Sequence, residues 1–183
     1  MPLTKTKPSK SFGQIRVLQK LNEYEFGVEL TMMRDGLNEN RWEYRNIKDH
    51  YRSFVGQPIL IAYVMGKIGD GHNSSEKVDP RTREKYYSYT DGTAERIVGT
   101  LSDDINDFSL VERDGHTWVV AKGKLFAFYA KELVDKIVRT GRMSVSVETL
   151  IHEMHKDGDT EVFTSWSGIG VTILGEGVAP AIP

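Results

Sequence analysis

Short runs of strand-type residues recur along this chain, whereas only two segments carry the spacing of an amphipathic helix. The helical spacings fall at residues 44–54 and 126–140, each followed by a glycine. Roughly seven or eight short strands are predicted, the clearest at residues 15–18, 26–30, 59–64, 97–101, 118–126, 143–148, 161–164 and 169–174. Because most strands follow one another without an intervening helix, the pattern predicts an α+β fold, mainly an antiparallel β-barrel with a few flanking helices. A doubly wound parallel sheet is the weaker alternative.

The length of 183 residues fits one domain. Residues 1–13 are rich in Lys, Ser, Thr and Pro without periodicity, so we expect a flexible N-terminal arm followed by a single domain at 14–183. Residues 66–93 are polar and glycine-rich, and they predict a long loop. The polar run Lys156–Asp159 predicts a turn.

Composition excludes several classes of function. With 24 basic and 26 acidic side chains the net charge is −2, which argues against nucleic acid as a main partner. The absence of cysteine removes disulfides, thiolate zinc sites and a cysteine nucleophile. The longest apolar run, residues 58–65, is too short to span a bilayer, and no secretory signal is evident. We therefore expect a cytoplasmic protein with no membrane partner.

One predicted strand carries polar residues where a buried strand would carry apolar ones. Ser144, Ser146 and Glu148 share one face, and the other face holds Met143, Val145 and Val147. The polar face is either a solvated ladder or the location of a serine nucleophile, which would need a histidine base.

Five histidines are candidates for that base: His50, His72, His116, His152 and His155. His50 and His116 are predicted to lie at the surface. Ser146 and His152 are six residues apart, about 20 Å on one extended strand, so they could hydrogen-bond only across a tight turn. His72, in the loop sequence Gly71-His72-Asn73, has no such restriction. Two histidines near Glu153 are too weak a pattern to predict a metal site, and no metal or other cofactor is expected.

Several short motifs, taken in order, resemble the prohead maturation proteases of tailed bacteriophages, which are related in fold to the herpesvirus assemblin serine proteases. The resemblance runs from about Gly27 to the C-terminus. The motifs are Asn38-Glu39-Asn40-Arg41, Val55-Gly56-Gln57-Pro58-Ile59-Leu60, Gly71-His72-Asn73, Ile97-Val98-Gly99-Thr100, Ser144-Val145-Ser146-Val147-Glu148, Gly170-Val171-Thr172-Ile173-Leu174 and Ala179-Pro180-Ala181.

The resemblance implies a herpesvirus-protease-like barrel and a single protease domain at residues 14–183. Its activity would be that of a serine endopeptidase that cleaves scaffold protein, coat protein and itself. It would act as a homo-oligomer inside the assembling procapsid, in the host cytoplasm, and without a cofactor. The alternative is a non-catalytic capsid-assembly or scaffold module on the same barrel. An unrelated binding barrel is a third possibility.

The resemblance also assigns residues. Ser146 is the expected nucleophile, with Ser144 as its alternate, and His72 is the expected base. The third catalytic residue is expected to be Glu39, with Asp35 next and His152 or His155 as the assemblin-like choice. The loop from Asn73 to Thr93 departs from the family in being longer and more charged than the catalytic role requires. We interpret it as a lid that orders with substrate or on oligomerisation, so we expect the isolated enzyme to be latent.

Overall fold

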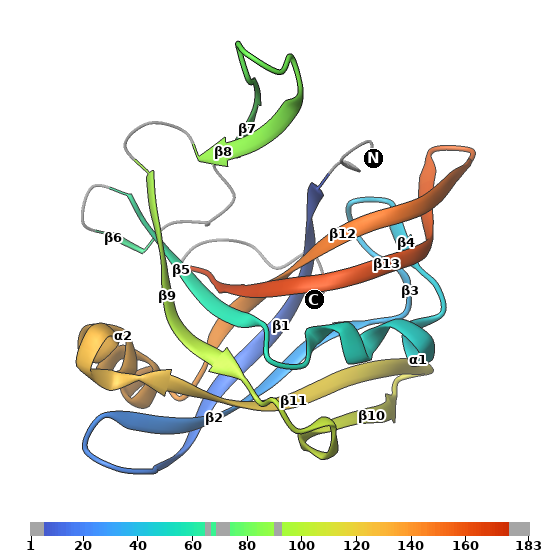
Figure 1. Cartoon of the computed structure of the whole chain (residues 1–183). Helices are drawn as coiled ribbons and strands as arrows, with labels where there is room; N and C mark the ends of the chain where they lie inside the picture. The colour runs from blue at the N-terminus through green and yellow to red at the C-terminus, as the bar shows by residue number, and fades with distance from the viewer. Residues whose placement is uncertain (1–5, 65–66, 69–73, 90–92, 176–183) are drawn as a thin grey trace.

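The computed structural model describes residues 6–64, 67–68, 74–89 and 93–175, and its centre is a closed seven-strand mixed β-barrel (Figure 1). The barrel strands, in chain order, are β1 (Thr6–Lys20), β2 (Glu25–Arg34), β5 (Pro58–Val64), β9 (Thr93–Leu101), β11 (His116–Phe126), β12 (Met143–Asp157) and β13 (Thr160–Ile173). Around the barrel they follow the order β13-β12-β1-β2-β11-β9-β5, and β5 returns to β13. Every neighbouring pair is antiparallel except β5 and β13, which run parallel. The predicted mainly antiparallel barrel is thus confirmed, and the doubly wound sheet was the wrong alternative.

Further strands lie outside the barrel. β3 (Gly36–Leu37) pairs with β4 (Trp42–Tyr44), and β4 extends the sheet beside β13. β10 (Phe108–Arg113) pairs with β11, and β6 (Lys67–Ile68) pairs with β5. A separate hairpin consists of β7 (Ser74–Val78) and β8 (Lys85–Tyr89). The prediction of an uninterrupted loop at 66–93 was therefore wrong, because residues 74–78 and 85–89 pair as an antiparallel two-stranded ribbon.

Two helices accompany the barrel, and one of them is shorter than predicted. α2 (Ala127–Thr140) ends as expected at Gly141, whose φ of 78° and N–H bond to Ile137 O (2.7 Å) cap the helix. α1 (Ile47–His50) continues directly into a 3₁₀ turn, η1 (Tyr51–Phe54). The predicted helical stripe from Tyr44 fails in its first turn, because Tyr44 belongs to β4 and Asn46 takes a left-handed conformation.

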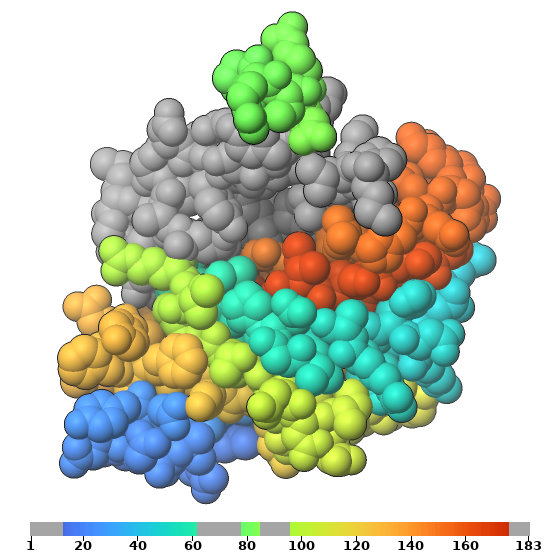
Figure 2. Space-filling model, viewed as in Figure 1, coloured from blue at the N-terminus to red at the C-terminus, as the bar shows by residue number. Residues whose placement is uncertain are grey.

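The α1–η1 segment covers one side of the barrel. In Figure 2 it is the teal surface between the red and orange β12–β13 hairpin and the yellow-green region that contains β10. Its Phe54 is fully buried and reaches the ring of Trp166 on β13, with 6.1 Å between the ring centroids. This packing fixes η1 against the middle of β13. A second 3₁₀ turn, η2 (Ile105–Asp107), precedes β10.

Alternate side chains of the barrel strands fill the core. Val145 and Val147 of β12 are fully buried in it, with Val171 and Ile173 of β13 and Ile59 of β5. The predicted strands at 161–164 and 169–174 are one continuous strand, β13, that follows the confirmed turn at Gly158 (φ 57°). β12 and β13 therefore form one long hairpin. None of the helices in the described ranges is long and apolar enough to cross a membrane.

Candidate active site

Ser146 lies on the outer face of the barrel wall. Its neighbours Val145 and Val147 point into the core, so the alternation of a strand turns Ser146 outward. Opposite it on β13 is Thr172. Although both residues are outward and polar, neither has any exposed surface, whereas Ser144 is half-buried. The outer face of the wall is thus shielded from solvent at Ser146, and the solvated-ladder interpretation does not apply there.

A carboxylate belongs to the same cluster. Thr172 Oγ1 donates a hydrogen bond of 2.5 Å to Glu148 Oε1. Glu148 is half-buried, two residues along β12 from Ser146 and on the same face. Burying a carboxylate is costly unless hydrogen-bond donors surround it, and the Thr172 hydroxyl is one such donor. We call Ser146, Glu148 and Thr172 the wall cluster.

β6, the last described strand before His72, occupies the same edge of β5 that pairs with Thr172 of the wall cluster. Tyr63 of β5 pairs with β9 on one edge of β5 and with Ile68 of β6 on the other edge. This second edge is the one along which β13 pairs with β5, and β6 lies beyond the end of β13. Thr172 pairs with Leu60 and Ile68 pairs with Tyr63, and these two β5 positions are three residues, about 10 Å, apart along the strand. His72 itself lies outside the described residues.

Glu39 is not near the wall cluster. It is exposed, in the turn between β3 and β4 that the Asn38 side chain organises by accepting hydrogen bonds from the backbone N–H groups of residues 40 and 42. The same turn is joined to β13 by the bond from Glu161 N to Arg41 O (2.9 Å). Glu161 and Thr172 are eleven residues apart on β13, about 36 Å of extended strand. The structure does not bring Glu39 and Ser146 together.

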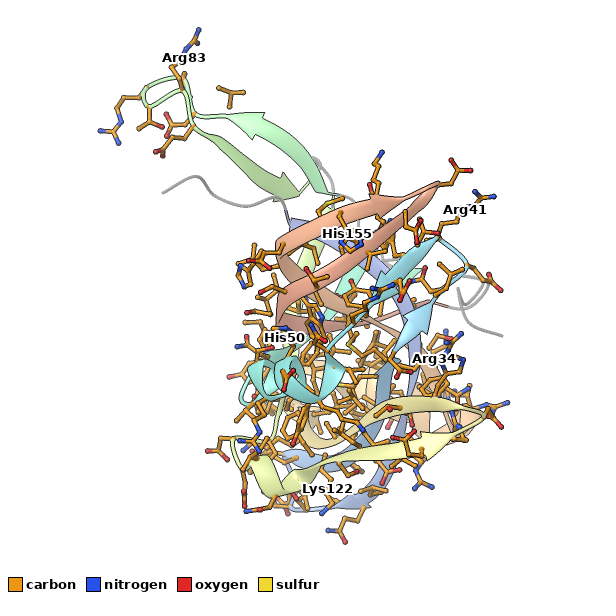
Figure 3. The ribbon with its side chains drawn as sticks, turned by 90° about the vertical axis from the view of Figure 1, so that its right-hand side faces the viewer. Arg34, Arg41, His50, Arg83, Lys122 and His155 are labelled. Atoms are coloured by element: carbon orange, nitrogen blue, oxygen red, sulfur yellow. The ribbon has the colours of Figure 1, made fainter. Side chains whose placement is uncertain are left out.

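Asp35 is held by β11 at the end of β2. Its Oδ1 accepts hydrogen bonds from Thr117 N (3.0 Å) and from the ring of His116 (3.2 Å). Arg34, labelled in Figure 3, lies 3.0 Å from that ring. These contacts fix the bend between β2 and β3, and they account for Asp35 without a role at the wall cluster.

The remaining histidines lie elsewhere. His50 (Figure 3) is half-buried rather than on the surface, since it packs on Trp166 with 5.2 Å between the ring centroids. His116 is also half-buried. His155 (Figure 3) is exposed, near the turn of the β12–β13 hairpin.

His152 is exposed, and its Nε2 lies 2.8 Å from Ser167 Oγ on β13. Sequence reasoning missed Ser167. Regular pairing about the predicted turn at 156–159 would place Ser165 opposite His152, so the contact with Ser167 depends on a register shift that the sequence does not show.

The structure also bears on metals. In the ranges that it describes, no three His, Asp or Glu side chains gather in a way that could hold a metal ion.

Taken together, the fold and the wall cluster define a closed seven-strand β-barrel protein with a shielded serine, threonine and glutamate on its outer face. The family model of the YonD N-terminal domain matches residues 24–183, so the chain belongs to the YonD N-terminal domain family. No curated protein and no solved structure matches the chain.

Proposed function

We propose that this protein is a serine endopeptidase of procapsid maturation, with Ser146 as the nucleophile and His72 as the base. The observation that carries the proposal is the shielded wall cluster. A serine without exposed surface lies on the outer face of the barrel, beside a threonine–glutamate hydrogen bond. A merely solvated polar strand would leave this serine exposed. The barrel implied by the resemblance agrees with the closed seven-strand barrel of the structure.

In the proposed reaction the His72 imidazole takes the Ser146 hydroxyl proton while the Ser146 oxygen attacks the scissile carbonyl. The imidazole then returns the proton to the leaving amine, and water hydrolyses the acyl-enzyme ester. Backbone N–H groups hold the oxyanion.

The third role is the orientation of His72. Glu39, the choice that the resemblance implies, is exposed in the β3–β4 turn at the far end of β13, and Asp35 is held by Thr117 and His116. Among the described carboxylates, Glu148 lies on the same strand and face as Ser146 and fits this role better.

Shielding of the nucleophile explains why the isolated chain would be latent. Because Ser146 has no exposed surface, a peptide carbonyl reaches it only after the outer face of the barrel opens. Oligomerisation inside the procapsid, on scaffold and coat protein as substrates, would supply that opening. Activity should then rise more steeply than in proportion to protein concentration.

The test is self-cleavage and cleavage of a scaffold-derived peptide by wild type, Ser146→Ala and His72→Ala, each at several protein concentrations. We expect cleavage in wild type and its loss in both variants. Ser144→Ala, two residues away on the same face, is the matched control and should keep the activity. Loss of cleavage in Ser144→Ala but not in Ser146→Ala would reassign the nucleophile. No cleavage that depends on either serine would refute the protease.

The same burial favours a second candidate, a capsid-assembly or scaffold module that has kept the barrel without the chemistry. Such a module would bind coat or scaffold protein equally well as wild type and as Ser146→Ala. It would also show no cleavage at any concentration, which separates it from the latent enzyme.

A further inference from the structure

The hydrogen bond between Ser167 and His152 is a second serine–histidine pair, distinct from the wall cluster. The two residues lie on neighbouring strands, and Nε2 and Oγ are 2.8 Å apart. With the imidazole proton on Nδ1, Nε2 accepts the serine hydroxyl proton, which is the arrangement a general base needs. Ser146 stands six residues from His152, about 20 Å along β12, so the two serines do not share this histidine.

A local irregularity of the hairpin creates the pair. Ile151 pairs with Trp166 and Glu153 pairs with Ser165, which leaves His152 as the extra residue of a β-bulge. A bulge turns its side chain out of the regular alternation and is frequent beside active sites. His152 is exposed and Ser167 is half-buried, so a small molecule can reach the pair from solvent. In this respect Ser167 differs from Ser146.

A backbone donor follows the serine directly. Gly168 N donates a hydrogen bond of 2.7 Å to Ser53 Oγ, and that hydroxyl donates to His50 O (2.6 Å). The N–H of the residue after a nucleophile is a common oxyanion donor. Here the Ser53 hydroxyl oxygen accepts the hydrogen bond from Gly168 N–H that the carbonyl oxygen of a substrate would accept during the reaction.

We propose that Ser167 is a second acylation site, with His152 as its base and small activated acyl or phosphonyl compounds as its substrates. Ser167 Oγ attacks the acyl carbon, its proton passes to His152 Nε2, and the leaving group departs with that proton. Water then hydrolyses an acyl ester on Ser167 and regenerates the serine, whereas a phosphonyl group, transferred by the same attack at phosphorus with loss of its leaving group, stays on Ser167. This activity is independent of the endopeptidase proposed above.

The reaction should be slow compared with that of a complete triad. In the part of the chain that the structure describes, no carboxylate accepts a hydrogen bond from His152 Nδ1. Removing the orienting carboxylate of a triad lowers the turnover about 10⁴-fold. We therefore expect single-turnover labelling rather than rapid turnover.

The experiment is labelling of the full chain with a fluorophosphonate probe, followed by identification of the modified peptide by mass spectrometry. We expect the label on Ser167 in wild type and in Ser146→Ala, and its absence in Ser167→Ala. His152→Gln should slow the labelling at least ~100-fold, because glutamine fills similar space but cannot take the proton. Ser165→Ala, on the same strand, is the matched control and should label as wild type does.

Two results would overturn the proposal: a wild-type chain without label on Ser167, or a His152→Gln chain that labels at the wild-type rate. Label on Ser146 alone would instead support the endopeptidase and reject the second site. Circular dichroism of each variant confirms that the barrel is intact before labelling is compared.

Discussion

The packing of η1 on β13 predicts that Gly168→Ala is strongly destabilising. Gly168 faces the core, where a Cβ atom would stand 2.3 Å from two carbons of the Phe54 ring. Ordinary contact begins near 3.4 Å, so the ring or the strand must move by about 1 Å. Phe54 is fully buried and has little room to move. Overpacking of this kind costs roughly 1–3 kcal/mol, and we expect the upper end of that range.

Urea denaturation measures the effect, with Gly170→Ala as the matched control on the same strand. There the new Cβ would meet Leu60 Cδ1 at 3.3 Å, Pro58 O at 3.5 Å and Glu148 Oε2 at 3.7 Å, none of them closer than 3.3 Å. Leu60 is half-buried and can adjust, so we expect a loss below about 1 kcal/mol. For a domain of this size, a loss of about 3 kcal/mol lowers the melting temperature by roughly 6–12 °C.

A double-mutant cycle identifies the cause of the loss. Phe54→Leu removes the ring that the new methyl group would strike, so the double variant should be less destabilised than the sum of the two single variants by at least about 1 kcal/mol. Two outcomes would refute the reasoning: equal losses for Gly168→Ala and Gly170→Ala, or strict additivity in the cycle. Either one would mean that Phe54 does not pack on Gly168 as the structure has it.

Two further predictions concern buried and charged hydrogen bonds. Tyr44→Phe removes the bond of 2.9 Å between the Tyr44 hydroxyl and Thr149 Oγ1, both almost fully buried, and should cost about 1–3 kcal/mol in urea denaturation; pairing it with Thr149→Val should restore part of the loss. Hydrogen bonds from Ser102 and then from Lys122 hold the pKa of Asp107 below its ordinary value, so Ser102→Ala should raise that pKa, as an NMR titration would show. A carboxyl group whose pKa is lowered in the folded state stabilises the fold when the pH is above the ordinary carboxyl pKa, and this stabilisation is lost as the pH falls through the lowered pKa. The loss of stability in Ser102→Ala should therefore be full at neutral pH and vanish in acid.

Local patterns predicted the elements whose causes are local. The alternation at 143–148, the turn at Gly158 and the capped helix ending at Gly141 all depend on neighbouring residues, and the structure has all three. The predicted helix beginning at Tyr44 was wrong for a local reason that the spacing of apolar residues does not show. The left-handed Asn46 separates the end of a strand from the start of a helix within three residues.

Features that depend on distant residues could not be predicted from the sequence. The parallel pairing of β5 with β13, which closes the barrel, joins residues more than one hundred positions apart. Nothing near Ser146 in sequence shows that Thr172 lies opposite it, or that the outer face is shielded there. For the same reason the resemblance that implied Glu39 as the third catalytic residue could not show that the β3–β4 turn carries it to the opposite end of β13.

One strand, β12, shows how a uniform polar pattern separates into three environments. Ser146 faces outward and is shielded, Thr149 faces inward and bonds Tyr44, and His152 leaves the alternation at a bulge and reaches Ser167. The shielded serine should react only after the barrel wall opens, whereas the exposed pair should react, although slowly, without any opening. The order in which Ser146 and Ser167 acquire a fluorophosphonate as the chain oligomerises therefore tests both proposals together. Early label on Ser167 and late label on Ser146 is the result they require; label on Ser146 before the chain oligomerises would contradict its shielding, and no label on Ser167 would reject the second site.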